Sequence, residues 1–562
     1  MRIRRLLGGL LALTLLAPSV AKAQTAKVVT GSSAMADGAV SPIEVTLGAL
    51  PQITPEVAAQ HPTAPPIGTG VSAAIYAQRK QAANLQSQFA TTGSSASAAP
   101  KVSGSGPAQT PFATGFAALK FPCGGKLVPP DQGLAVGRSY VVEMVNACVA
   151  VYDKAGNLQA GFPKSLNTFF GLGAAAFTYD PRAIYDWVNN RFIAIATRSG
   201  GSIKPQILVA VSQTDNPLGG WHIYNLKGAA GTLVGELSDF PELGQDRKAV
   251  YVSFNRFDAS QNFVDARIMI LPKGVMYSGG VLTYAYWYNF TLGGLTLDTI
   301  QPANEFSPSD HPRAEFFLES LNINFGGGQC SSGCKGLVVW AISNPLVGNG
   351  VISGFVIGTA NTYYFPPEAS QPSCTNCIDT DDVRITGGVT YHAGSLFGSL
   401  NTAASGAGPH VLWFEVKPVL NDNNGVCSNN ACPQIVGASI ANEGCFFCGS
   451  SGNWYYGTLQ PDLENNVTMV FNYSDSTYAP SVAYVSRRAT MPQNAMHDAG
   501  IFLFNPMADY ALEPMRWGDY SATAPDLTTA SSQVWFAGEF SNALGVWRTA
   551  IGHNSFNLVT NP

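Results

Sequence analysis

The chain has 562 residues, of which 46% are hydrophobic and only 12% charged, and its formal net charge is -5. Average soluble domains carry roughly 25% charged residues, so this composition indicates a chain that can bury a large core. No basic run follows the first few residues, which argues against nucleic acid or an anionic membrane surface as a partner.

The first residues predict export. Three arginines at positions 2, 4 and 5 precede an apolar run over residues 6–16, and small residues around 21–23 resemble a signal-peptidase site. The run is too short to cross a bilayer, which takes about 20 residues, and no later segment replaces it. We expect a signal peptide at residues 1–23 and a secreted or periplasmic protein with no membrane span.

Residues 24–115 differ in composition from the rest of the chain. They are rich in Ala, Ser, Thr, Gly and Pro, and have one helix-forming patch at residues 75–89. A segment with so little hydrophobic density buries little core. We therefore predict a low-complexity leader or linker with a short helix, of undetermined role.

From residue 116 onward the pattern is strand, turn, strand. Runs of β-branched and aromatic residues at 139–153, 206–213 and 410–418 are bounded by Gly, Asn, Asp or Pro. No amphipathic helix separates the runs, which disfavours a parallel α/β fold. An array of β-sandwiches is the alternative, although its units are usually nearer 100 residues.

One pattern recurs seven times: a polar or aromatic opener followed by a short strand-forming run. Neighbouring openers are 49 to 72 residues apart. Loosely spaced strand-forming repeats are typical of propeller blades. The sequence thus predicts an all-β fold, a seven-bladed β-propeller over residues 116–562. The openers are Asp131, Asp180, Asp239, Asp310, Asp382, Trp454 and Asp519.

Ten cysteines suit an oxidising compartment. Two of the local couples are C-x-x-C pairs, which also suit zinc or thiol-redox chemistry, but neither follows a strand and opens a helix as a redox motif should. We favour five structural disulfides, although spacing by itself does not choose the connectivity. The couples are Cys123 with Cys148, Cys330 with Cys334, Cys374 with Cys377, Cys427 with Cys432, and Cys445 with Cys448.

The segment from Ser212 to Trp221 is similar to a degenerate Asp-box, a turn of sialidase-type propellers. Together with PPDQGLAVG, DPRAIYDWVNNRF, SDFPELG and RWGDYSA, it resembles exported bacterial β-propeller proteins of the sialidase-like (Asp-box) superfamily, which are mostly of unknown function. The resemblance implies a propeller fold and export, but no settled reaction.

Residues just before the innermost strand of each blade should converge on one mouth of the central channel, a concave site ringed by polar groups. Glycoside hydrolysis needs two carboxyl groups across the scissile bond, and lyase chemistry needs a base. The alternative for each aspartate is structural, as an acceptor of backbone N–H groups that links neighbouring blades. The acid/base candidates are Asp131, Asp239, Asp519, His311 and Tyr520, and Asp180 and Asp382 are ligand-binding candidates.

Three arginines lie within three residues of an opener: Arg182, Arg384 and Arg516. Sialidases hold a carboxylate with three convergent arginines, so the resemblance implies an anion or uronic-acid grip here. The alternative is that each arginine forms a salt bridge with a neighbouring opener. Trp517 is a candidate for stacking on a sugar ring, with burial in the blade core as the alternative.

These observations predict a monomeric exported propeller that binds a glycan or another extracellular polymer in its axial funnel. It would act either as a sialidase-like hydrolase or lyase, or as a non-catalytic module that binds glycan or protein. No metal or cofactor is expected. The Asn-rich turn at residues 421–425 lacks the bidentate Glu of an EF-hand loop, so a structural calcium has no support.

Overall fold

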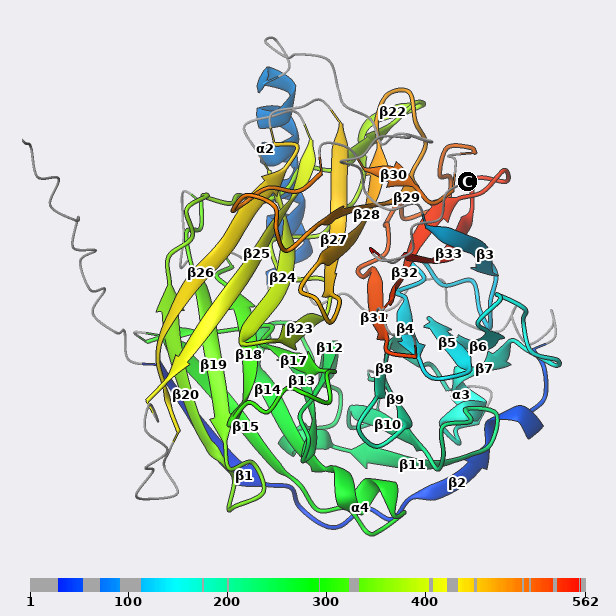
Figure 1. Cartoon of the computed structure of the whole chain (residues 1–562). Helices are drawn as coiled ribbons and strands as arrows, with labels where there is room; N and C mark the ends of the chain where they lie inside the picture. Colours follow the sequence, from blue (N-terminus) through cyan, green and yellow to red (C-terminus); the bar gives the residue numbers. More distant parts are fainter. Residues whose placement is uncertain are drawn as a thin grey trace, which may run out of the picture.

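The computed structural model describes a mostly β chain with few helices (Figure 1). The predicted signal peptide, residues 1–23, lies outside the described residues. The described ranges are 29–53, 71–90, 113–173, 176–199, 202–292, 294–322, 333–403, 408–421, 433–448, 452–497, 500–504, 507–528, 533–554 and 556.

The strands after residue 132 form antiparallel groups that follow one another along the chain. The first three groups are β4 (Gly133–Val136), β5 (Tyr140–Val145), β6 (Cys148–Asp153) and β7 (Lys164–Ser165); β8 (Tyr179–Asp186), β9 (Arg191–Arg198), β10 (Gln206–Ser212) and β11 (Gly220–Lys227); and β12 (Leu237–Gln245), β13 (Ala249–Phe257), β14 (Phe263–Pro272), β15 (Ala285–Leu292) and β16 (Leu295–Thr296).

Four further groups complete the series within the described residues. They are β17 (Gln301–Glu305), β18 (Ala314–Ser320), β19 (Leu337–Ser343) and β20 (Val351–Ile357); β23 (Val389–His392), β24 (Ser395–Ala403), β25 (Pro409–Leu420) and β26 (Ile435–Phe446); β27 (Asn453–Pro461), β28 (Val467–Ser474), β29 (Ser481–Arg487) and β30 (Ile501–Phe502); and β31 (Ala522–Asp526), β32 (Gln533–Ser541) and β33 (Trp547–Asn554). Short helices α3 (Leu166–Phe169), α4 (Lys273–Tyr277), η1 (Leu47–Ala49) and η3 (Ala229–Gly231) lie in connections.

The first strand of each group lies beside the first strand of the next. β4 contacts β8, and the contacts continue through β12, β17, β23 and β27 to β31, which returns to β4. These inner strands run in the same direction, as the parallel pairing of β12 with β17 and of β17 with β23 shows. The result is a closed circle of sheets around an axis (Figure 1), and the prediction of a mostly β, propeller-like fold is confirmed.

Each sheet is buried on both faces because it packs between two neighbours. In β13, Val250 and Val252 belong to the apolar cluster shared with the preceding group, whereas Ala249 and Tyr251 belong to the cluster shared with the following group. Alternate residues of a strand point to opposite faces, so continuous apolar runs are what such a strand requires. This explains why the chain can be so poor in charge.

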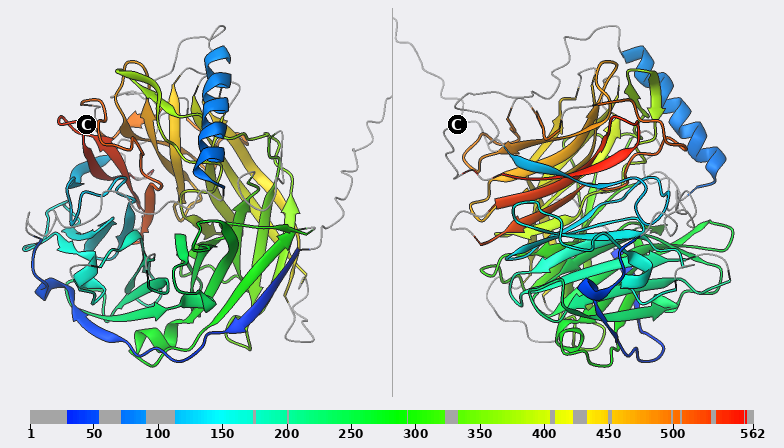
Figure 2. Two further views of the ribbon diagram at one scale, coloured as in Figure 1. Left: turned by 180° about the vertical axis from the view of Figure 1, so that it is seen from behind. Right: turned by 90° about the vertical axis from the view of Figure 1, so that its right-hand side faces the viewer.

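Part of the predicted leader is built into the circle. β1 (Val29–Met35) pairs with β15, β2 (Ile43–Thr46) pairs with β11, and β3 (Thr114–Lys120) pairs with β33. β3 thereby supplies the outer strand of the last group from the N-terminal side of the chain. The predicted helix is present as α2 (Ala73–Ala90), an Ala-rich segment without Gly or Pro, and it lies on one face of the molecule (Figure 2).

The segment similar to an Asp-box forms the hairpin between β10 and β11. Ser212 and Trp221 face each other in the strand register, and Trp221 Nε1 donates to the Pro217 carbonyl at 2.8 Å. Its role within the described residues is to hold a turn, as the resemblance implies.

Three of the five predicted cysteine couples are disulfides in the described residues: Cys123–Cys148, Cys374–Cys377 and Cys445–Cys448. Cys334 is also disulfide-bonded, while Cys330, Cys427 and Cys432 lie outside the described residues. Both C-x-x-C pairs therefore form local disulfides rather than a zinc or redox centre.

Replacing Cys123 and Cys148 together with alanine should lower the free energy of unfolding by about 3 kcal/mol, because their bond closes a loop of 25 residues. Chemical denaturation of the oxidised proteins measures the difference. The same denaturation under reducing conditions should bring the two proteins closer together, and an equal loss in both conditions would contradict the explanation.

Candidate functional site

Left-handed bends mark the entries to six of the inner strands within the described residues. Such a bend places the neighbouring side chains at the hub, where the inner strands begin. Asp tolerates the left-handed region better than most residues because its short side chain bonds locally, which suits Asp131, Asp180 and Asp381 to these bends. The bent residues are Asp131, Asp180, Phe240, Thr299, Asp381 and Tyr456, with φ between +46° and +57°.

Several hub side chains connect one group of strands to the next. Asp131 accepts a hydrogen bond from the backbone N–H of Asp519 at 2.9 Å, across 388 residues of sequence. Asn146 accepts from the N–H of Asp180 at 2.8 Å, and Asp180 accepts from the N–H of Phe240 at 3.3 Å. Asp131 and Asp180 therefore have the structural role of accepting backbone N–H groups and linking neighbouring groups of strands.

The three predicted arginines reach the hub, and each one forms a salt bridge. Arg182 pairs with Glu242, and Arg516 pairs with Asp519. Arg384 lies 2.6 Å from Asp381 and 3.0 Å from Asp382. All three side chains are buried.

Aromatic rings contact two of these guanidinium groups. The Arg182 Cζ atom lies 3.2 Å from the centroid of the Tyr520 ring, and the Arg384 Cζ atom lies 4.2 Å from that of Phe240. The two rings are themselves 4.8 Å apart between centroids. Contact with an aromatic face suits the planar, weakly hydrated guanidinium, so side chains from four groups of strands meet at this point.

Burial and mutual repulsion shift the hub carboxyl groups toward their neutral forms. Burial, opposed by Arg516 and reinforced by the charge of Asp131, raises the pKa of Asp519 to about 7. Burial also raises the pKa of Asp131, and burial with the neighbouring charge of Asp239 raises that of Asp180 well above its usual range. A carboxyl group that keeps its proton near neutral pH can act as a general acid.

Some buried polar atoms at the hub have no hydrogen-bond partner among the described residues. They are Asp519 Oδ1, Arg516 Nη1, the Tyr520 hydroxyl, and both amide atoms of Gln132. An unpaired buried donor or acceptor costs about 1–3 kcal/mol, so native structures usually supply a water or a ligand to such atoms. The hub therefore has free bonding capacity where Asp519, Arg516 and Tyr520 meet.

A small cavity continues along the axis from these residues. Its volume is about 50 Å³, and Gln132, Arg182, Glu242, Asn304, Thr390 and Ser521 are among the residues that line it. Pockets for organic ligands are typically about 300 Å³ or larger, whereas a polar space of this size suits a few water molecules. A sugar ring does not fit in the axial cavity itself.

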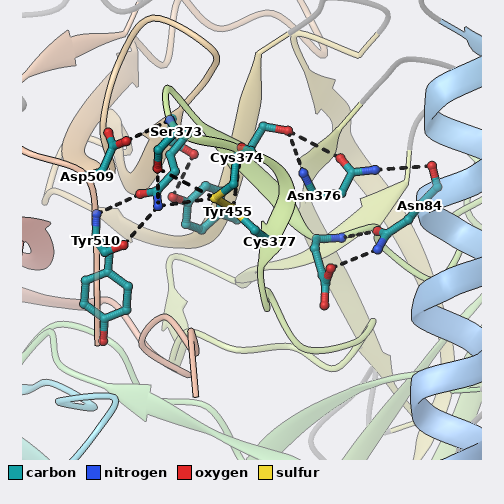
Figure 3. Close-up of a disulfide and its surroundings, with 12 residues drawn as sticks. Asn84, Ser373, Cys374, Asn376, Cys377, Tyr455, Asp509 and Tyr510 are labelled. Atoms are coloured by element: carbon teal, nitrogen blue, oxygen red, sulfur yellow. Dashed lines mark hydrogen bonds between the residues drawn. A yellow bond between two sulfur atoms is a disulfide. The ribbon is translucent and has the colours of Figure 1, made fainter. Parts of the chain in front are cut away.

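Helix α2 packs against the segment at residues 365–382, which leads into the hub. The Tyr76 hydroxyl donates to Asp379 at 2.9 Å, and Lys80 Nζ lies 3.0 Å from the same carboxylate and donates to the Asp381 carbonyl. Farther along α2, Asn84 Nδ2 donates to Glu368 at 2.9 Å. This second contact lies beside the disulfide hairpin of β21 (Ala369–Gln371) and β22 (Cys374–Ile378) (Figure 3).

The structure brings together most of the residues that the sequence singled out. Asp131, Asp180, Arg182, Asp239, Asp382, Arg384, Arg516, Asp519 and Tyr520 are buried at the hub and interact with one another. Arg182, Arg384 and Arg516 all lie at the hub. The roles of these residues in catalysis or binding stay predictions.

His311 is placed differently from the prediction. In its unit the inner strand β17 is entered at Asp298 and Thr299 and ends at Glu305, so Asp310 and His311 follow the strand and lie at its opposite end. His311 is exposed, and its Nε2 atom lies 3.4 Å from Arg247 Nη2. The predicted position of His311 at the hub mouth is corrected, because a strand-forming run after Asp310 was assigned to the inner strand and is in fact β18.

Two aromatic candidates are less suited to their predicted roles than expected. Trp517 is fully buried and packs edge-on against Tyr510, with 4.8 Å between ring centroids. It is therefore a core residue and is not exposed for stacking on a sugar ring. Burial and the charge of Asp180 raise the pKa of Tyr520 well above its usual value, which disfavours Tyr520 as a proton-abstracting base.

Other hub residues escaped the sequence reasoning. Glu242 follows the opener Asp239 in the sequence DFPE, Asp381 directly precedes Asp382, and Asp298 precedes the true inner strand of its unit. Alternation along the entry segments offered a signal for Glu242, since residues three apart across a bulge share the axial face. Nothing local in the sequence indicated that Tyr76 and Lys80 lie at the hub mouth.

The described residues contain neither a candidate metal cluster nor a candidate membrane-spanning helix. No group of three or more His, Cys, Asp or Glu side chains in the described part of the chain is arranged to hold a metal ion. Within the same residues, no helix has both the length and the apolar character needed to cross a membrane. The Asn-rich turn at 421–425 lies outside the described residues except for Asn421.

No protein-family model matches the chain, and no curated protein is similar to it. Among solved structures, it is similar to a protein of unknown function from Dyadobacter fermentans, with 10% identity over 67% of this chain and 94% of the other and a TM-score of 0.30. It is also similar to an exo-β-1,3-galactanase from Phanerochaete chrysosporium (12% identity, 79% and 97%, TM-score 0.28).

A third similar structure is the catalytic domain of an α-L-arabinofuranosidase from Coprinopsis cinerea (8% identity, 59% of this chain and 98% of the other, TM-score 0.26). TM-scores this low carry no inference about function. None of the three is named as a sialidase, so the sialidase-like resemblance of the sequence stays a prediction.

Proposed function

We propose that this chain is an exported, seven-bladed β-propeller that binds a glycan at the hub mouth, where its inner strands begin, and cleaves it by acid/base chemistry. The blade count is supported by the antiparallel groups of strands that succeed one another in the described residues and by the contact of β31 with β4. Export is supported by the basic and apolar residues at the start of the sequence.

The pairing of Asp519 with Asp131 carries this proposal. Asp519 has a pKa raised to about 7, one of its oxygens has no partner among the described residues, and its backbone N–H bonds the carboxylate of Asp131. Glycoside hydrolysis uses a protonated carboxyl group and a second carboxyl group close to it. We assign the proton-donating role to Asp519.

The charge of the hub favours a neutral sugar over a sugar acid. Arg182, Arg384 and Arg516 are each paired with a carboxylate of the chain, so an incoming anion would have to compete with a partner already in place. Binding of an anionic sugar by the three arginines, which the resemblance implies, is for this reason less favoured than binding of a neutral sugar.

Non-catalytic binding of a glycan or a protein is the second candidate. Its support is that Glu242, Asp381, Asp382 and Asp519 all form salt bridges, as structural carboxylates do.

A screen of the purified full-length protein against a panel of polysaccharides separates the candidates. Reducing ends report hydrolysis, unsaturated products report lyase activity, and retention on immobilised polymer reports binding. New reducing ends from a neutral polysaccharide support the proposal. Retention without product supports the non-catalytic binding module. If the protein gives no product and is not retained, both candidate functions are ruled out.

We further propose that α2 limits access to the hub mouth, because it contacts the segment that leads into the hub. Lys80 is buried and holds Asp379 with a charge-assisted contact, and such a contact contributes about 1.5–3 kcal/mol. Lys80→Met should therefore raise the population with α2 displaced, and the turnover of the responding polysaccharide, by about tenfold.

The exposed neighbour Gln81, changed to methionine, is the matched control. Amide hydrogen exchange over residues 379–384 provides a readout that needs no substrate, and Asn84→Ala tests a second α2 contact. Faster exchange with unchanged or lower turnover would show that α2 does not limit access to the hub.

A further inference from the structure

A second cavity lies outside the hub, between the outer strand β3 and strand β6 of the first group. Its volume is about 670 Å³, which is within the range of sites for small organic ligands. Figure 1 shows β3, β6 and β33 together on this side of the molecule. The cavity shares no lining residue with the small axial cavity, so a ligand there would be independent of the hub.

Most of the wall of this cavity is apolar. Six residues that line it bring hydrocarbon or aromatic surface: Ile53, Ala117, Leu119, Pro122, Tyr152 and Leu158. The disulfide-bonded Cys123 also lines it, so the bond to Cys148 holds the adjoining loop against β6. Water gains few hydrogen bonds from such a wall, and an apolar ligand of matching size would displace it favourably.

The charged residues that line the cavity are all cations: Lys120, Lys126 and Arg548. Arg548 faces Lys120 in the register of β3 and β33. The lysines are exposed, and no salt bridge pairs any of the three with a carboxylate among the described residues. Arg548 Nη2 donates weakly to the Ala117 carbonyl at 3.4 Å, and its buried Nε has no partner within the described residues.

One acidic group lies behind this wall. Glu143 is buried, and the Tyr152 hydroxyl donates to it at 3.2 Å. Burial raises the pKa of Glu143 to about 7, with Arg548 lowering it in part, so below neutral pH this carboxyl group leaves the positive charge of Arg548 uncompensated.

From the volume, the apolar wall and the three cations, we propose that this cavity binds an amphiphilic carboxylate, an apolar body with one anionic head group. The body lies against Ala117, Leu119 and Leu158, and the head group lies toward Lys120, Lys126 and Arg548. Opposite charge at a partly desolvated site stabilises the complex more than the same contact in open water.

Titration calorimetry of the full-length protein with dodecanoate and with dodecanol tests this proposal, because the two probes share a chain and differ in charge. We expect saturable binding of dodecanoate that is about tenfold tighter than binding of dodecanol. An aromatic probe, 1-anilinonaphthalene-8-sulfonate, in competition with dodecanoate shows whether the body that fits is aliphatic or aromatic.

The double variant Lys120→Met/Lys126→Met should weaken dodecanoate binding about tenfold and leave dodecanol unchanged. Both lysines are exposed, so the variant should fold, and thermal unfolding verifies this. Lys248→Met, an exposed lysine outside the cavity lining, is the control. Equal affinity for the two probes, equal loss in the control, or no saturable binding would overturn the proposal, whatever the polysaccharide screen shows.

Discussion

Replacing Arg182 with methionine should lower the free energy of unfolding by about 3–5 kcal/mol. The Arg182 guanidinium pairs with Glu242, whose side chain is only 3% exposed. Its Cζ atom lies 3.2 Å from the Tyr520 ring centroid, and its Nε donates to the Pro241 carbonyl at 3.1 Å. Its removal leaves a buried carboxyl group without its cation. Arg182 lowers the pKa of Glu242, which burial raises, so the loss of Arg182 should raise that pKa further and add the cost of protonating Glu242 to the free energy of folding.

Chemical denaturation at pH 7 measures this loss. The double variant Arg182→Met/Glu242→Gln should recover part of it, because no charge then remains to be buried. Lys227→Met, an exposed lysine at the end of β11, should change stability by less than about 0.5 kcal/mol. A loss below about 1 kcal/mol for Arg182→Met would indicate that water reaches the hub and that its ion pairs are screened.

Asp519→Asn should reduce turnover of the responding polysaccharide by about 10²- to 10⁴-fold, because an amide cannot donate the proton that the leaving oxygen needs. Retention on the same polymer should persist. The wild-type rate should fall as pH rises through about 7, since only the protonated form of Asp519 can act as the acid. Initial rates across pH 5 to 9 measure this profile.

Arg516→Met offers a sharper version of the same experiment. The guanidinium of Arg516 lowers the pKa of Asp519, so its loss should move the falling limb of the pH profile to higher pH. A merely structural role for Arg516 would lower the rate without moving the limb. A rate for Asp519→Asn within threefold of the wild type would remove Asp519 from the mechanism and favour the binding module.

Some features of this chain could be predicted because nearby residues determine them. The apolar runs with period-two alternation become strands buried on both faces, as in β13, and α2 forms where Ala, Gln and Lys replace Gly and Pro. Cysteines three residues apart, such as Cys374 and Cys377, can form a local disulfide because closing so short a loop costs little entropy.

The hub was predicted in part. Aspartate openers identified the entries to most of the inner strands, and at Asp131 and Asp180 the opener itself takes the left-handed bend of the entry. The same rule failed at His311, since two strand-forming runs follow one another in that unit and the sequence contains nothing that ranks β17 before β18.

By itself, then, the sequence determined the strands, the helix, the local disulfides and the approximate positions of the inward bends, all of which depend on interactions over a few residues. Only the tertiary structure decided which charged groups meet. The contact between Asp131 and Asp519 and that between Lys80 and Asp379 join residues about 300 or more positions apart. The first pair forms because the circle of sheets closes on itself, and the second forms because α2 packs against the segment at residues 365–382. No local pattern records either pairing.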